Sequence, residues 1–121
     1  MAHGNSTASS MSEVVNQLMN TDHCKALDMP LDMSTEIMLE KAVAMVKEID
    51  EGKGVLLLTD MGSLTMMGEL IEQKTGIKVR TITLASTAIV LEALRKSLMQ
   101  DMSLDEIYAD LKQTFQKECS I

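Results

Sequence analysis

The sequence predicts an α/β fold: a doubly wound, mainly parallel sheet with helices on both faces. Segments with helical periodicity alternate with short apolar segments of strand length, which is the pattern of parallel sheets. The continuous apolar run Val55–Thr59 fits a strand that is covered on both faces. Connections are short, and 45% of the 121 residues are hydrophobic, so residues 1–121 are expected to form one domain.

The first third of the chain predicts a helix, a short strand and a second helix. The first helix has apolar residues at helical spacing on one face, Met11, Val14, Val15, Leu18 and Met19. Ser6 or Thr7 could cap this helix, and Lys25–Met29 is a short strand candidate that Pro30 ends. Ser34 is expected to cap the second helix, whose buried face carries Met38, Ala42, Met45, Val46 and Ile49.

The remainder of the chain continues the alternation. Gly52 and Gly54 end the second helix and lead into the strand Val55–Thr59. A third helix, closed by Gly76, precedes a strand at Val79–Leu84, and Ser103 caps the last helix. The buried faces of these later helices are expected to hold Leu64, Met67 and Ile71, then Val90, Leu91, Leu94 and Leu98, and finally Leu104, Ile107, Tyr108, Leu111 and Phe115.

The composition of the chain argues against several classes of function. The formal charge is −7 and the only aromatic residues are Tyr108 and Phe115, so the domain offers neither a basic patch nor a stacking surface for nucleic acid. No apolar stretch approaches the length of a membrane span, and no signal peptide precedes His3, so a cytoplasmic protein is expected. Cys24 and Cys119 are expected to be reduced thiols. His23 beside Cys24 gives too few ligands for a metal, and neither a metal nor a cofactor is expected.

Two polar segments could form a site. His3 and Gly4 are followed by the hydroxyl- and amide-rich run 5–10, which leads into the first helix. A helix N-terminus favours anions such as a phosphoryl group. The second segment, Thr59-Asp60-Met61-Gly62-Ser63, follows a strand, and ligands of such sheets bind outside the carboxyl ends of the strands.

The chemistry that these residue types allow is phosphoryl transfer to histidine. Neutral imidazole is nucleophilic near pH 7, and His3 would need an acceptor such as Asp60 to fix its tautomer. Ser63 could supply a hydroxyl and a backbone N–H to the phosphoryl oxygens. Ordinary alternatives stay open: His3 could belong to a frayed terminus, and Asp60 and Ser63 could be helix caps.

Four stretches match a known family in order: Ala2-His3-Gly4, Asp28-Met29-Pro30-Leu31, residues 54–64, and Ser86-Thr87 with Val90-Leu91-Glu92-Ala93. Together they resemble the enzyme IIA domain of the mannose-type sugar phosphotransferase system. The resemblance is closest to the version carried inside levanase-operon-type transcriptional activators, which depend on the sigma-54 factor. It extends over nearly the whole chain.

The resemblance implies the mannose-type IIA fold and a cytoplasmic, usually dimeric domain that takes phosphate from the carrier protein HPr. His3 would be the phosphorylated residue and Asp60 the carboxylate that holds its ring. Ser63 would lie in the turn that faces the phosphate, and Gly62, Gly4 and Ser6 complete the expected phosphate-binding set. No metal or further cofactor is implied.

Three departures from the family pattern bear on function. The turn after Asp60 is shorter than in transport-type domains, which favours a regulatory role over transfer to a IIB component. This turn also resembles the phosphotransferase subunit of dihydroxyacetone kinases, although the start of the chain does not. Only Met1 and Ala2 precede His3, so most of the family's first strand is missing. A transport IIA phosphocarrier, a dihydroxyacetone kinase subunit and a non-catalytic dimerisation module remain alternatives.

Overall fold

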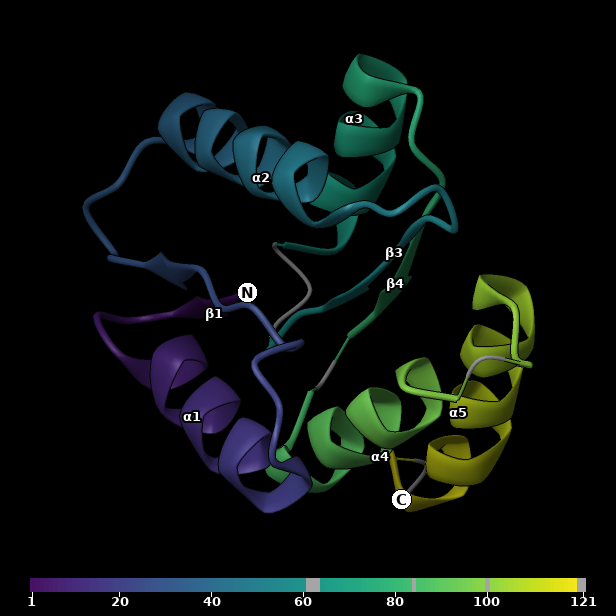
Figure 1. The fold of residues 1–121 in the computed structure, drawn as a ribbon. Helices are drawn as coiled ribbons and strands as arrows, with labels where there is room; N and C mark the ends of the chain where they lie inside the picture. The colour runs from purple at the N-terminus through teal and green to yellow at the C-terminus, as the bar shows by residue number, and fades with distance from the viewer. Residues whose placement is uncertain (61–63, 84, 100, 120–121) are drawn as a thin grey trace.

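The computed structural model describes residues 1–60, 64–83, 85–99 and 101–119, and the side chains of residues 65 and 116–119 are not among the described features. Helices and strands alternate through most of the chain, and a final pair of helices follows the last strand (Figure 1). In order, the elements are β1 (Ala2–His3), α1 (Thr7–Met19), β2 (Asp28–Met29), α2 (Thr35–Ile49), β3 (Val55–Leu58), α3 (Thr65–Thr75), β4 (Val79–Ile82), α4 (Thr87–Ser97) and α5 (Leu104–Cys119).

The strands form two parallel pairs that meet at β1. Strand β1 pairs with β2, and β3 pairs with β4 in the register Val55 to Val79. The amino group of Met1 donates to the carbonyl of Leu58 at 2.7 Å, so β1 lies beside the end of β3. The described strands thus form two separate two-stranded parallel sheets, β1 with β2 and β3 with β4, and the Met1 bond joins the start of one to the end of the other.

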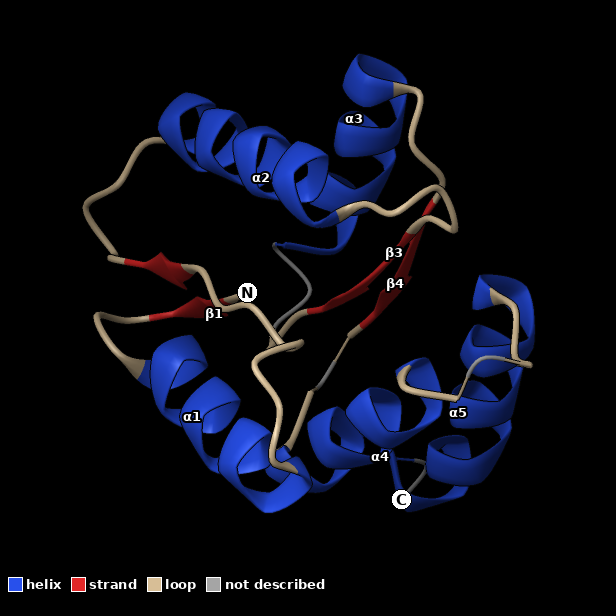
Figure 2. Cartoon of the chain, in the orientation of Figure 1, coloured by secondary structure: helices blue, strands red, loops and turns tan. Residues whose placement is uncertain are grey.

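Helices cover both faces of the strands, which confirms the predicted fold class (Figure 2). Val55 and Leu57 face one way and pack with α2 and α3 in a single apolar cluster. Leu56 and Leu58 face the other way, toward α1, α4 and α5. The run is apolar at consecutive positions because alternate residues enter two different cores.

The helix boundaries largely match the capping residues in the sequence. The Ser34 and Ser86 hydroxyls accept hydrogen bonds from the backbone N–H groups three residues later, at the starts of α2 and α4. Ser103 and Glu106 bond to each other's backbone N–H in a reciprocal capping box ahead of α5. Gly76 ends α3 with a φ of 73°, a left-handed conformation that glycine adopts without strain.

Some predictions were wrong in detail. The strand candidate Lys25–Met29 shortens to β2, because β1 offers only two residues for it to pair with. On α1, Val15 is fully buried, but Val14 and Leu18 are exposed. Ala8 and Ser12 take their places in the buried face, so the helix is rotated relative to the predicted stripe. On α4, Val90 and Leu94 are buried, whereas Leu98 lies beyond the helix and is exposed.

Gly54 has a packing requirement at the start of β3. Its φ is 89°, and a Cβ at this position would lie 2.6 Å from the carbonyl oxygen of Lys78 and 2.7 Å from a methyl group of Leu104. Only glycine therefore allows the loop before β3 to approach both β4 and α5 this closely. Among the described residues, no helix combines the length and the apolar character needed to cross a membrane.

Candidate functional site

His3 and Asp60 meet at the carboxyl ends of two neighbouring strands. His3 is the last residue of β1, and Asp60 follows β3 by two positions. Their side chains come together although 57 positions separate them in the sequence. In open α/β folds, ligands bind outside the carboxyl ends of the strands, which is where this pair lies.

Asp60 holds His3 through both of its carboxylate oxygens. Oδ1 lies 3.1 Å from the ring Nδ1 of His3, and Oδ2 accepts the backbone N–H of His3, also at 3.1 Å. The two side chains are 17% and 21% exposed, which leaves the pair accessible at the surface but mostly shielded from water. One carboxylate therefore fixes both the ring and the backbone of His3.

The pKa of Asp60 reflects this arrangement. Partial burial of the carboxyl group acts to raise it, but the hydrogen bonds from the His3 backbone and ring outweigh burial. The net result is an Asp60 pKa below its ordinary value. Asp60 is thus an anion at neutral pH and can accept a hydrogen bond from Nδ1–H. This assigns the N–H of neutral imidazole to Nδ1 and the nucleophilic lone pair to Nε2.

The turn after His3 leads directly into α1. Gly4 has a φ of 103°, and its N–H donates to the carbonyl of Met29 at 2.8 Å, which continues the pairing of β1 with β2. Ser6 occupies the cap position of α1 but makes no side-chain capping bond, and it is exposed. The first turn of α1 contains no acidic residue. An exposed hydroxyl and the positive end of a helix dipole therefore lie just beyond the histidine.

Asp28 binds to this same helix from the neighbouring strand. Its carboxylate accepts the backbone N–H of Ser9 at 3.1 Å and the hydroxyl of Ser9. Asp28 lies in the predicted strand, and a turn role before Pro30 was expected for it, but its side chain caps α1. This contact was not predictable from local sequence, because it joins residues 19 positions apart. The only signal was a carboxylate at the end of a strand candidate.

Thr59 is a second residue near the site whose environment was not predictable from the sequence. It is fully buried beside Asp60, and its hydroxyl has no hydrogen-bond partner in the described structure. Its backbone is well paired, since its N–H donates to Ile82 and its carbonyl accepts from Ala85. These backbone bonds extend the pairing of β3 with β4 up to the residue before Asp60.

The remaining predicted residues lie apart from this pair or outside the described residues. Gly62 and Ser63, both expected to bind phosphate, lie outside them. His23 is exposed and belongs to the loop between α1 and β2. The described part of the chain contains no group of three or more His, Cys, Asp or Glu side chains that could hold a metal.

Comparison with known proteins gives a consistent assignment. Residues 1–112 match the family described as PTS system fructose IIA component. The chain is 46% identical over 114 residues to the transcriptional regulatory protein LevR of Bacillus subtilis. It is 34% identical over 79 residues to the transcriptional regulatory protein DagR of Salmonella typhimurium. These matches cover 94% and 65% of the chain, but only 12% and 8% of the two regulators.

Solved structures show the same fold. A crystal structure of a sigma-54 interaction domain protein from Enterococcus faecalis has a TM-score of 0.84 at 39% identity, with 98% of this chain and 88% of that chain covered. The mannose/sorbose-specific IIA subunit of the phosphotransferase system from the same organism has a TM-score of 0.74 at 17% identity, with 99% and 89% covered. At 17% identity, the second likeness concerns the fold alone.

Proposed function

The chain belongs to the PTS system fructose IIA component family, and on this basis we propose that it accepts a phosphoryl group on His3. The observation that carries the proposal is the two-point attachment of His3 to Asp60. A histidine held by a carboxylate through Nδ1 has the tautomer that a phosphoryl acceptor needs. The same carboxylate stabilises the positive charge that develops on the ring as Nε2 attacks.

The proposed donor is the phosphohistidine form of HPr. In the transfer, the bond between the donor's ring nitrogen and phosphorus breaks as a bond forms between Nε2 of His3 and phosphorus. The donor keeps the electron pair of the broken bond. Asp60 hydrogen-bonds Nδ1–H throughout and is not consumed. Ser6, near the start of α1, has an exposed hydroxyl that could bind a phosphoryl oxygen, and Gly4, Gly62 and Ser63 complete the proposed set.

We further propose that phosphorylation of this domain is regulatory rather than a step in sugar transport. The support is the 46% identity to LevR and the 39% identity to the sigma-54 interaction domain protein. Phosphorylation adds negative charge beside an acidic carboxylate, on a domain whose formal charge is already −7. Such a change alters contacts with neighbouring domains through like-charge repulsion or new ion pairs. We therefore propose a cytoplasmic location for the protein.

Self-association as a homodimer is also proposed, in agreement with the family resemblance. The exposed Val14 and Leu18 lie one turn apart on α1 and give that helix an apolar outer stripe. Light scattering of the purified domain checks the oligomeric state. A monomer at every concentration would contradict this part of the proposal.

The decisive experiment is incubation with phosphoenolpyruvate, enzyme I and HPr. The domain should acquire an acid-labile, base-stable phosphate, and His3→Gln should abolish it. His23→Gln is the matched control, because His23 is an exposed histidine outside the site. Equal labelling of the two variants, or a label that survives acid, would contradict phosphorylation of His3.

A further inference from the structure

Helix α1 is capped differently from α2 and α4. In those two helices the hydroxyl of the capping serine, Ser34 or Ser86, accepts the N–H three residues later. At α1 the corresponding N–H belongs to Ser9, and it donates instead to the carboxylate of Asp28 at 3.1 Å. The hydroxyl of Ser9 donates to the same carboxylate. A residue of the neighbouring strand therefore supplies the cap that Ser6 would ordinarily supply.

The backbone of Ser6 differs in the same way. Ser6 occupies the cap position, since its carbonyl accepts the N–H of Ser10 at 2.8 Å. Its ψ is 6°, whereas Ser34 and Ser86 have the extended ψ values of 153° and 168° that are typical of capping serines. Ser6 is exposed, and its hydroxyl makes no capping bond. The Ser6 hydroxyl is therefore not used to stabilise the helix.

Asp28 is fixed to the strand that carries His3. Its backbone lies in β2, in the register that places it one position before the partner of His3 in β1. Only residues 4–6 separate His3 from α1. A Cβ on Gly4 would lie 3.2 Å from the hydroxyl oxygen of Thr7, the first residue of the helix, so this turn packs closely against α1. The Asp28 carboxylate therefore ties the first turn of α1 to the strand of the proposed phosphoryl acceptor.

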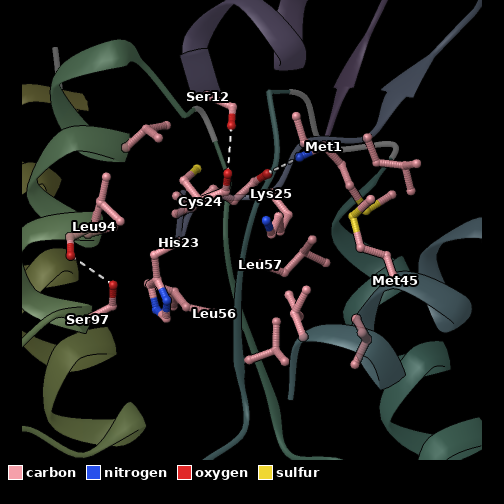
Figure 3. Close-up of a pocket in the computed structure, with 18 of the residues that line it drawn as sticks. Met1, Ser12, His23, Cys24, Lys25, Met45, Leu56, Leu57, Leu94 and Ser97 are labelled. Carbon is pink, nitrogen blue, oxygen red and sulfur yellow. Dashed lines mark hydrogen bonds between the residues drawn. The ribbon is translucent and has the colours of Figure 1, made fainter. Parts of the chain in front are cut away.

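The rest of α1 is held by other contacts. The Ser12 hydroxyl donates to the carbonyl of Cys24 at 2.7 Å, as Figure 3 shows. The side-chain amide of Asn16 bonds both the carbonyl and the N–H of Cys24, at 2.8 and 3.0 Å. Val15 is fully buried and packs with apolar residues of α4. Loss of the Asp28 contact should therefore release the first turn and leave the remainder of the helix in place.

We infer that Asp28 is a positioning residue for phosphoryl transfer: it caps α1 in place of Ser6 and so keeps the Ser6 hydroxyl available for a phosphoryl oxygen. The inference rests on the proposed phosphorylation of His3. Without Asp28, the N–H of Ser9 loses its acceptor, and an unpaired N–H at a helix start favours the hydroxyl of the capping residue. Ser6 then caps α1 as Ser34 caps α2, and its hydroxyl is withdrawn from the phosphoryl group.

Asp28 acts in this role as a hydrogen-bond acceptor rather than as a charge. A carboxylate near a phosphoryl group repels it, so the negative charge alone would slow the transfer. Asp28→Asn keeps an oxygen that can accept the Ser9 N–H and removes the charge. This variant should therefore be phosphorylated at a rate within about threefold of the unmodified chain, whereas Asp28→Ala should not.

The test is a double-mutant cycle of Ser6→Ala and Asp28→Ala, in which the rate of phosphorylation by phosphorylated HPr and the thermal unfolding midpoint are measured for each chain. Each single variant should slow phosphorylation by about tenfold or more, the effect of one hydrogen bond to a charged group, and the double variant should be no slower than either.

Stability should show the opposite pattern. Ser6→Ala alone should leave the unfolding midpoint unchanged, because Ser6 makes no capping bond. In the Asp28→Ala chain, Ser6→Ala should lower the midpoint by about 3–5 °C, because Ser6 has become the cap. Asp32→Ala removes an exposed carboxylate from the loop after β2 and is the control, which should change neither quantity.

Three results would overturn the inference and leave the proposed function intact. Effects on the phosphorylation rate that multiply in the double variant would show that Asp28 does not act through Ser6. A midpoint that Ser6→Ala leaves unchanged in the Asp28→Ala chain would show that Ser6 does not take over the cap. Equal rates for Asp28→Asn and Asp28→Ala would exclude the role as an acceptor. Absence of label on the unmodified chain would instead contradict the proposed function itself, together with this inference.

Discussion

Asp60 binds His3 at two points, the ring Nδ1 and the backbone N–H, each at 3.1 Å. The backbone bond holds the end of β1 beside the residues that follow β3. The bond to Nδ1 fixes the side chain of His3 as well. Asp60 therefore holds both the backbone and the ring of His3.

Removing the carboxylate should impair phosphorylation without unfolding the domain. We expect Asp60→Asn to slow phosphorylation by about 10²–10⁴, the range for a positioned acid–base partner, because an amide can stabilise the wrong ring tautomer. Asp60→Ala should be at least as slow. The rate is measured with phosphorylated HPr as donor, and the exposed Asp22→Asn is the control. A rate within about threefold of the unmodified chain would exclude a role for Asp60 in the transfer.

The Asp60 carboxylate should make the stability of the fold depend on pH in the acid range. The folded-state pKa of Asp60 is lowered, so its contribution is present above its ordinary value of 3.8 and is lost as pH falls through the folded value. Unfolding midpoints measured between pH 6 and pH 2 should fall less steeply for Asp60→Asn than for the unmodified chain. Asp105→Asn offers a comparison. The pKa of Asp105 is also lowered, chiefly by its hydrogen bond from Lys78, but Asp105 lies on an exposed surface. Identical acid profiles for Asp60→Asn and the unmodified chain would contradict the assignment.

The sequence predicted the fold because its local signals agree with one another. Ser34 and Ser103 cap helices, Gly76 ends one, and the apolar run at β3 has the length of a doubly covered strand. The contact between His3 and Asp60 was expected from the chemistry of histidine sites and from the family resemblance, and the two side chains do meet at 3.1 Å. Asp60 was expected at the carboxyl end of a strand, the edge at which parallel sheets bind ligands, but the strand that carries His3 could not be recognised from two residues.

Other features were not predictable because they depend on contacts between distant segments. Nothing near Asp28 in the sequence indicates that its carboxylate caps α1 through Ser9. The exposure of Val14 and Leu18 depends on how α1 rotates against α4, and either of two overlapping stripes has helical spacing. The two-residue β2 depends on the length of its partner β1 rather than on its own apolar content.

The cap between Asp28 and Ser9 should contribute measurable stability. Asp28→Ala removes the acceptor for the Ser9 N–H and a negative charge near the positive end of α1, so we expect a loss of about 1 kcal/mol. Denaturant unfolding measures this, and the exposed Asp32→Ala is the matched control. If the losses in the free energy of unfolding caused by Ser9→Ala and Asp28→Ala are fully additive in the double variant, the two side chains do not interact.

The hydroxyl of Thr59 is expected to lower the free energy of unfolding. The side chain is fully buried and its hydroxyl has no partner in the described structure, so the hydroxyl carries an uncompensated desolvation cost. Valine has nearly the same shape and lacks that cost. We therefore expect Thr59→Val to raise the free energy of unfolding by about 1 kcal/mol, as measured by denaturant unfolding.

The matched control for this change is Thr75→Val, which removes a hydroxyl that does have partners. The Thr75 hydroxyl donates to the Ile71 carbonyl at 2.7 Å and accepts from the Ile77 N–H at 3.1 Å. This variant should be destabilised, because it leaves the Ile77 N–H without its acceptor. A destabilised Thr59→Val would mean instead that the Thr59 hydroxyl is bound, and slower phosphorylation of that variant would assign it to the site beside Asp60.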